Sequence, residues 1–183
     1  MRILIIGPPG AGKGTQATVL SEELGVVHIS TGEEFRTQVD GETELGRQVK
    51  RYLDAGVLVP DEVTNAMVAR RLTEDVCRVG FILDGFPRTV AQAEMLEDLL
   101  RERDCEIDTV LVLDAPEDEV VERLLARGRD DDTEDVIRYR QQLYRAETTP
   151  LLDFYADRLV TVPAVGSVPD VTARALDALR TRA

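Results

Sequence analysis

Apolar residues gather in five short runs along the chain, at residues 2–6, 26–29, 80–84, 109–114 and 158–163. Three of these runs are continuous rather than alternating in polarity, which is typical of parallel strands covered on both faces. The pattern therefore predicts strands of one sheet that is buried on each side.

Segments with helical periodicity separate these runs. Residues 13–24 follow the first run, apolar residues recur at helical spacing within 89–104 and 116–127, and 168–179 predicts a terminal helix. Strands that alternate with helices predict an α/β, doubly wound sheet. Ligands of such sheets bind at the carboxyl ends of the strands.

The segment 30–75 departs from this alternation, because its pattern is helical almost throughout, with turn signals at Asp40-Gly41, Gly56 and Pro60. It is too long for one crossover helix. We expect a small helical subdomain over the edge of the sheet, which is a natural candidate for a mobile substrate clamp.

Residues 7–15 read GPPGAGKGT and lie directly after the first apolar run. Glycines let backbone N–H groups approach an anion, the following helix contributes the positive end of its dipole, and Lys13 adds a full charge. The general form of this motif has a hydroxyl residue directly after the lysine, whereas here Gly14 precedes Thr15. The segment predicts a phosphate-binding loop; the alternative is a glycine-rich turn that binds nothing.

Asp84 ends the third apolar run and is followed by Gly85. A carboxylate at this edge of the sheet would lie near the phosphate-binding loop, where a metal ion that bridges phosphates needs an acidic partner, directly or through water. Taken alone, an Asp-Gly pair after a strand is usually only a turn. Arg88, a few residues later, is either a bidentate phosphate ligand or a solvated arginine at the head of a helix.

Residues 30–36, STGEEFR, also allow two interpretations. Thr31 and Glu34 form a candidate capping box, with Arg36 as a surface residue. The functional interpretation places Arg36 in a second phosphate site.

Residues 127–132 read RGRDDD. In the structural interpretation, Arg127 ends a helix, Gly128 caps it, and the acidic run is a solvated loop. In the functional one, several arginines surround a phosphoryl group in transfer. Arg138 and Arg140 lie two positions apart and cannot share a helix face, so at most one of them points into such a site.

Length, charge and cysteine content limit the classes of function that the chain can have. The chain of 183 residues fits one domain, and its 22 Lys and Arg against 35 Asp and Glu give a formal charge of −13. This charge disfavours nucleic acid and anionic membranes as partners, so a phosphate site must be a local concentration of arginines. No apolar stretch approaches the length of a membrane span. The two isolated cysteines, Cys77 and Cys105, are expected to be packed thiols, which indicates a reducing cytoplasm. His28 is expected to have a structural role.

Four segments, in this order, resemble the adenylate kinases and related nucleoside monophosphate kinases: GPPGAGKGTQ at 7–16, ISTGEEFR at 29–36, LDAGVLVPDE at 53–62 and GFILDGFPRTVAQA at 80–93. The resemblance covers essentially the whole chain, and the Gly14-Thr15 order is the form that this family uses. It implies reversible transfer of the terminal phosphoryl group of ATP to AMP, giving two ADP, with Mg²⁺. The partners expected are ATP, AMP and ADP, with no nucleic acid or membrane, and the protein is expected to be a cytoplasmic monomer.

The family's architecture implies a P-loop kinase fold, with a five-stranded parallel sheet and helices on both faces, as a single domain over 1–183. A helical AMP-binding insertion is expected at 30–59 and a short lid loop at 126–134. Many relatives carry a long lid, sometimes with a zinc site. Here only Gly128 separates Arg127 from Arg129, so the resemblance implies the short-lid form without zinc.

The resemblance also assigns site residues. The ATP site is expected to comprise Gly10, Ala11, Gly12, Lys13, Gly14, Thr15, Arg127 and Gly166. The AMP site is expected to comprise Thr31, Arg36, Val57, Leu58, Val59, Gly85, Phe86, Pro87, Arg88, Gln92, Arg129 and Arg140. The catalytic set is expected to comprise Lys13, Asp84, Arg88, Arg127, Arg129 and Arg140, with Asp84 holding the metal through water.

Two alternatives remain at this point. The first is a UMP/CMP kinase of the same fold; that group typically has Ala in place of Thr31 and Asn near the position of Gln92, so this sequence favours AMP. The second is a non-catalytic nucleotide-binding switch. A switch usually needs one nucleotide site, and the second phosphate site implied by Arg36 and Arg88 argues against it.

Overall fold

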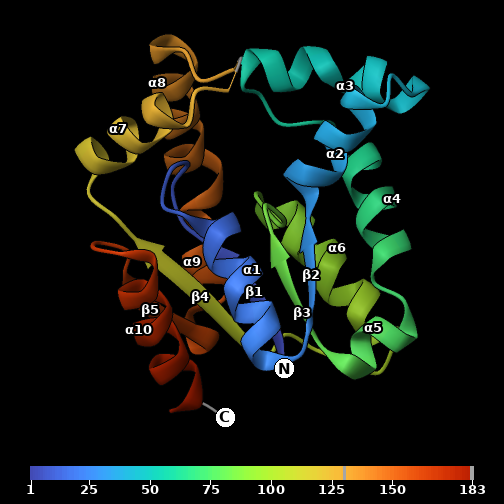
Figure 1. Cartoon of the computed structure of the whole chain (residues 1–183). Coiled ribbons are helices and arrows are strands. Elements are labelled where there is room, and N and C mark those ends of the chain that lie inside the picture. The colour runs from blue at the N-terminus through green and yellow to red at the C-terminus, as the bar shows by residue number, and fades with distance from the viewer. Residues whose placement is uncertain (130, 182–183) are drawn as a thin grey trace.

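One parallel sheet forms the centre of the computed structural model, which describes residues 1–129 and 131–181 (Figure 1). Its strand order is β2-β3-β1-β4-β5. The strands are β1 (Arg2–Ile6), β2 (Val27–Ser30), β3 (Phe81–Asp84), β4 (Thr109–Asp114) and β5 (Leu159–Pro163). Each lies within one residue of an apolar run, so the predicted five-stranded parallel sheet is confirmed.

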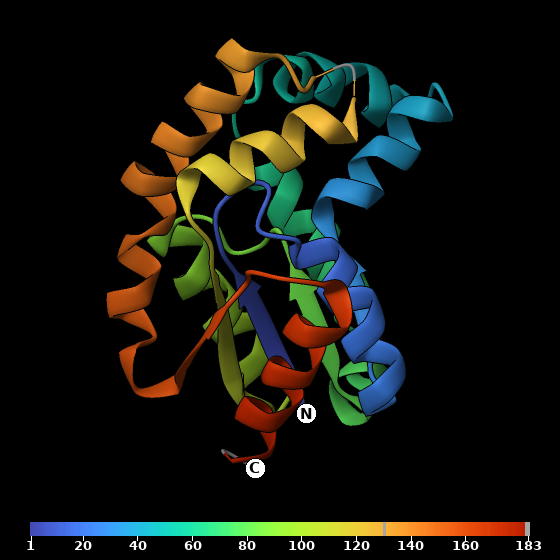
Figure 2. The same ribbon diagram turned by 60° about the vertical axis from the view of Figure 1, so that its left-hand side comes forward.

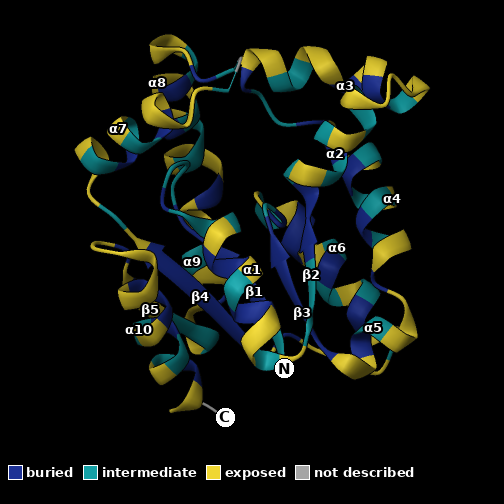
Figure 3. Ribbon diagram, in the orientation of Figure 1, coloured by how far each residue is buried: buried dark blue, intermediate teal, exposed yellow. Residues whose placement is uncertain are grey.

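Side chains of each strand alternate between two hydrophobic clusters. In β1, Ile3 and Ile5 face one cluster, while Leu4 and Ile6 face the other. The first cluster is covered by α1 (Lys13–Leu24), α7 (Glu117–Arg127) and α10 (Val168–Arg180). The second is covered by α4 (Asp61–Arg71), α5 (Glu74–Val79), α6 (Val90–Arg101) and α9 (Pro150–Phe154). Figure 2 shows the sheet between these layers, and Figure 3 shows that its inner strands β1, β3 and β4 are almost wholly buried.

The segment after β2 is helical, as its pattern predicts. It contains α2 (Thr31–Asp40) and α3 (Glu44–Ala55), followed by α4 and α5. Phe35, Val49 and Val59 form a small hydrophobic cluster separate from the two beside the sheet. Figure 1 shows α3 beyond the carboxyl ends of the strands, across from α7 and α8 (Glu134–Leu143).

The capping box predicted for Thr31 and Glu34 is wrong, because the N-cap of α2 lies one residue earlier, at Ser30. Strand β2 carries Ser30 into an extended conformation, so Ser30 becomes the N-cap of α2 and its Oγ accepts a hydrogen bond from the backbone N–H of Glu33 at 3.4 Å. Thr31 is therefore the first helical residue. Its hydroxyl is free to donate to the carbonyl oxygen of Asp84, at 3.4 Å.

The helices between α7 and β5 are the part that the sequence pattern missed. They are α8, a π-helical turn η1 (Tyr144–Thr148), α9 and a short 3₁₀ turn η2 (Ala156–Arg158). The buried positions of α8 are Ile137 and Gln141. A buried face that includes a polar residue gives only a weak hydrophobic period.

Other local expectations are met. Helix α7 ends at Arg127, and Gly128 follows with a φ of 68°, as predicted for its cap. Cys77 is buried, and Cys105 packs against the same cluster. Within the expected lid at 126–134, Asp130 lies outside the described residues. No helix in the described part of the chain has the length and apolar character required to cross a membrane.

Candidate active site

A cavity of about 720 Å³ opens at the carboxyl ends of the strands. The loop after β1, the start of α2, the end of β3, helices α7 and α8 and the loop after β5 all contribute to its wall. A volume of this size is typical of a small-molecule site, and its position is the one expected for an open α/β sheet.

The phosphate-binding loop, residues 7–15, forms one side of this cavity. Helix α1 begins at Lys13, so the unpaired N–H groups of its first turn face the space in front of the loop. The Lys13 ammonium donates to the carbonyl oxygens of Gly7, at 2.7 Å, and Pro8, at 2.9 Å. Burial lowers the pKa of Lys13 to about 8. The loop thus holds a cation away from bulk water.

Asp84 lies beside this loop. Its carboxylate is buried and accepts a hydrogen bond from the Ser30 hydroxyl at 3.3 Å. A Cβ added at Gly14 would lie 3.5 Å from Asp84 Oδ2, so the missing side chain at this position leaves the acid facing the start of α1. The order Gly14-Thr15, which departs from the general motif, has this local consequence.

Asp84 is a hard oxygen ligand of the kind that Mg²⁺ prefers. Among the described residues, no group of three or more His, Cys, Asp or Glu side chains could hold a metal ion. A single carboxylate next to a phosphate-binding loop fits an ion that takes its other ligands from phosphates and water. The residues present therefore fit a nucleotide-bound magnesium ion.

A second set of cavity-lining residues comes from α2, the segment before α4 and the turn after β3. The expected residues found there are Thr31, Arg36, Val57, Leu58, Val59, Gly85, Pro87, Arg88 and Gln92. Arg88 Nε donates to the Gly85 carbonyl oxygen at 2.8 Å. Gly85 has a φ of 80°, and a Cβ there would lie 2.7 Å from the Thr31 hydroxyl. Only glycine allows β3 to turn this closely past α2.

Phe86 is the one expected site residue that the structure does not bring to the cavity. It is not part of the cavity wall, and it is buried in the core beneath the turn. Its neighbours Gly85 and Pro87 do line the cavity.

The arginines around the cavity repel one another. Burial lowers the pKa of Arg36, and the charge of Arg127 lowers it further. Burial likewise lowers the pKa of Arg129, with Arg36 as the next cause. The pKa of Arg88 is also lowered by burial, and Arg140 adds to this effect. Crowded cations in a chain of net charge −13 are the local concentration that a phosphate site requires.

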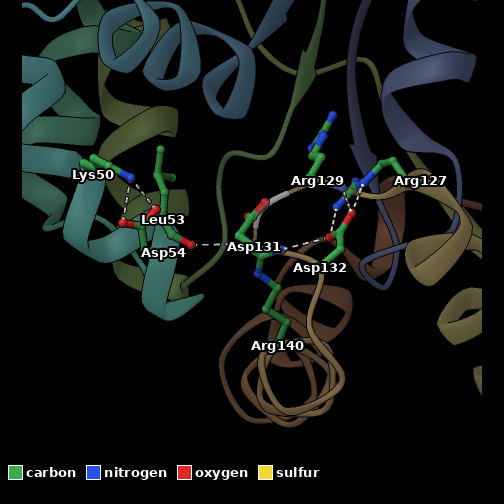
Figure 4. Close-up of polar contacts among 8 residues, drawn as sticks. All are labelled: Lys50, Leu53, Asp54, Arg127, Arg129, Asp131, Asp132 and Arg140. Atoms are coloured by element: carbon green, nitrogen blue, oxygen red, sulfur yellow. Dashed lines mark hydrogen bonds and ion pairs between the residues drawn. The ribbon is translucent and has the colours of Figure 1, made fainter.

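Two aspartates, Asp131 and Asp132, accept hydrogen bonds from the remaining arginines of the cavity (Figure 4). Asp132 accepts hydrogen bonds from Nε and Nη2 of Arg127, at 2.8 and 2.6 Å, and from the backbone N–H of Arg129 at 3.1 Å. Asp131 accepts from Arg140. Arg140 also donates to the Leu53 carbonyl oxygen at 3.1 Å, which joins α8 to the end of α3. All three arginines line the cavity, as expected.

Gly166 lines the cavity at the loop after β5, as expected. Sequence reasoning missed Arg123, which also lines the cavity and donates to the Ala164 carbonyl oxygen of this loop at 2.9 Å. Its position four residues before Arg127, on the same helix face, was the available signal. Gln141, also missed, is buried and donates to the Pro9 carbonyl oxygen at 2.9 Å, which supports the phosphate-binding loop from α8.

Comparison with known proteins agrees with this geometry. A family model described as adenylate kinase matches residues 5–160. An adenylate kinase of Nocardia farcinica is 58% identical over 179 residues, which cover 98% of this chain and 99% of that protein. Adenylate kinases of Mycolicibacterium vanbaalenii and Rhodococcus erythropolis are 57% and 56% identical, with the same coverage.

Proposed function

The chain belongs to the adenylate kinase family, and on this basis we propose that its cavity catalyses the Mg²⁺-dependent transfer of the terminal phosphoryl group of ATP to AMP. The chain is a nucleoside monophosphate kinase. One observation carries the assignment of the site: cationic groups from separate segments line one cavity, with Lys13 in the phosphate-binding loop, Arg36 in α2 and Arg88 after β3. Two phosphorylated ligands can therefore face each other.

In the donor half, the backbone N–H groups from Gly10 to Thr15 hold the ATP phosphates. Lys13 leaves its carbonyl partners and binds the group in transfer. Gly166 and the rest of the loop after β5 lie at the adenine of ATP. In the acceptor half, Arg36 and Arg88 bind the AMP phosphate, and Gln92 with residues 57–59 contacts the base. Arg127, Arg129 and Arg140 lie around the phosphoryl chain.

The transfer needs little acid–base chemistry, because an AMP phosphate oxygen is already a nucleophile. Catalysis then consists of alignment and stabilisation of charge on the group in transfer. Magnesium, when bound, would neutralise phosphate charge, and Asp84 would hold it through water. The arginines supply further positive charge where the phosphoryl oxygens pass.

Closure over the ligands is assigned to the insertion at 30–59 and the lid at 126–134. The contacts of Arg140 support this, because it donates to the Leu53 carbonyl oxygen of the insertion and also to Asp131 of the lid, and so links the two parts. With a lid this short, both parts must exclude water, since ATP hydrolysis competes with transfer. We expect a cytoplasmic monomer that binds ATP, AMP and ADP and neither nucleic acid nor membranes. No specific observation favours a UMP/CMP kinase or a nucleotide switch.

A coupled assay tests the proposal. ADP formation is measured with ATP and each nucleoside monophosphate in turn, with and without Mg²⁺. AMP is expected to turn over fastest, and only with Mg²⁺. Faster turnover with UMP or CMP would overturn the acceptor assignment.

Substitution of Arg88 tests the site itself. Arg88→Ala is expected to lower turnover by at least about 100-fold, because it removes charge from the transition state. Its melting temperature without ligand should not fall, since the substitution removes a cation that lies close to another arginine, Arg140. The control is Arg101→Ala, at an exposed arginine that pairs with Asp98 on the same helix. A folded Arg88→Ala variant with near-normal turnover would contradict the proposal.

A further inference from the structure

The amide of Gln92 is held at both ends. Gln92 is 2% exposed, lies in the first turn of α6 and lines the cavity. Its Oε1 accepts a hydrogen bond from the backbone N–H of Arg88 at 2.7 Å. Its Nε2 donates to Oδ1 of Asp61 at 2.7 Å. Asp61 is the first residue of α4, so this contact joins two elements on the acceptor side of the cavity.

These partners permit only one orientation of the amide. A backbone N–H can only donate, and an ionised carboxylate can only accept. A flipped amide would set its NH₂ group against the Arg88 N–H and its oxygen against the Asp61 carboxylate. Both contacts would then be repulsive. The orientation of Gln92 is therefore fixed by its surroundings, and Asp61 is the partner that a side-chain substitution can remove.

Within the part of the chain that the structure describes, the fixed amide keeps one donor and one acceptor unused. Each amide has two N–H groups and two oxygen lone pairs, and Asp61 and Arg88 occupy one of each. The remaining pair matches adenine, whose 6-amino group donates and whose N1 accepts. Hypoxanthine, the base of IMP, has the reverse pattern, with an accepting O6 and a donating N1–H.

We propose that Asp61 is a positioning residue that makes the acceptor site select a 6-aminopurine over a 6-oxopurine, by fixing the amide of Gln92. This inference rests on the proposed function, which places the AMP base at Gln92. Without the carboxylate, the amide turns more freely and accepts both hydrogen-bond patterns. Asp61 touches neither substrate in this scheme and acts only through Gln92.

A purely structural role is the competing explanation. Gln92 stands three residues after Thr89, the N-cap of α6, and its contacts also stabilise the start of that helix. If Asp61 only supports the fold, its loss lowers stability and leaves the choice of base unchanged. The ratio of kcat/KM for AMP to kcat/KM for IMP separates the two roles.

The test uses Asp61→Asn in the full chain, with AMP and IMP as acceptors at saturating ATP. Asparagine is isosteric and can either donate or accept, so it no longer imposes one orientation. The AMP:IMP ratio is expected to fall by about tenfold or more, the effect of misdirecting one hydrogen-bond pair. The KM for ATP should not change. An unchanged AMP:IMP ratio in a folded variant would overturn the inference.

Glu62→Gln is the matched control, because it removes the same charge from the same first turn of α4. It should leave the ratio at its original value. If Asp61→Asn does not fold, Asp61→Ser repeats the test, since serine also suits a helix start and lacks the carboxylate. The unsubstituted chain separates the two proposals: a chain that does not phosphorylate AMP refutes the proposed function, whereas an active chain whose selectivity ignores Asp61 refutes only this inference.

Discussion

The carboxylate of Asp132 accepts two parallel hydrogen bonds from the guanidinium group of Arg127, at 2.8 and 2.6 Å. The Asp132 side chain is fully buried, whereas that of Arg127 is 34% exposed. Burial raises the pKa of Asp132, but the hydrogen bonds from Arg127 and the Arg129 backbone outweigh it, so the net pKa lies below the ordinary value. An ionised aspartate thus fixes an arginine that faces the cavity.

Replacement of this carboxylate should therefore cost both stability and activity. We expect Asp132→Asn to lower the free energy of unfolding by about 2 kcal/mol, because it removes the buried, charged partner of a half-buried ion pair. Turnover should also fall, since Arg127 and Arg129 lose their common acceptor. Urea unfolding and the coupled assay measure the two effects. Asp135→Asn, at an exposed position at the start of α8, is the control and should change neither.

Two glycines of the phosphate-binding loop allow a matched pair of alanine substitutions. Gly10 and Gly12 have φ values of 92° and 88°, so alanine is strained at both. A Cβ at Gly10 would lie 2.5 Å from the Val120 carbonyl oxygen, whereas a Cβ at Gly12 would have no atom within 4 Å. Gly10→Ala should therefore lower the free energy of unfolding by about 1–3 kcal/mol more than Gly12→Ala. Equal losses would show that close packing against α7 does not matter.

Lys13 gives nucleotide binding a pH dependence. Its pKa is lowered by burial to about 8 in the free protein, and phosphate charge favours the protonated form. Above pH 8, therefore, ATP binding should take up a proton, and its Kd should rise by up to about tenfold for each pH unit. Below pH 7 the lysine is already charged in the free protein, and this effect should vanish.

Calorimetry measures this uptake directly. The heat of ATP binding at pH 7 and pH 9 is compared in two buffers with different heats of ionisation. Lys13→Arg, which keeps its charge over this range, should show no uptake from this position. Absence of proton uptake by the unsubstituted protein at pH 9 would count against a lowered pKa.

Local signals explain why the donor half was predictable. β1, the glycine-rich loop and α1 follow one another within residues 2–24, so the apolar run, the glycines and the helix start all lie in one short segment. The bounds of β1 and α1 match the prediction. Roles of individual side chains in ATP and AMP binding stay predictions that the assays above address.

Contacts between distant residues explain what was missed. Gln141 supports Pro9 across 132 positions, and Asp61 reaches Gln92 across 31. A buried polar residue gives no hydrophobic period, and its partner lies in another element, so neither appears in a sequence pattern. The capping box of α2 failed for a related reason: Ser30 and Thr31 are both good N-caps, and only the end of β2 decides between them.

Strands β1 and β3 are neighbours in the sheet, with Ile5 paired to Asp84. Main-chain hydrogen bonds keep such neighbours about 4.8 Å apart whatever their side chains. The spacing between the phosphate-binding loop and Asp84, the acid proposed to hold the metal, is thus set by the backbone and not by the segments proposed to close over the ligands. In the proposed closure, the insertion and the lid approach a reaction centre of constant dimensions. Exchange of these two segments with those of relatives should therefore alter substrate choice and opening rates. It should not change the distance between the phosphate-binding loop and Asp84.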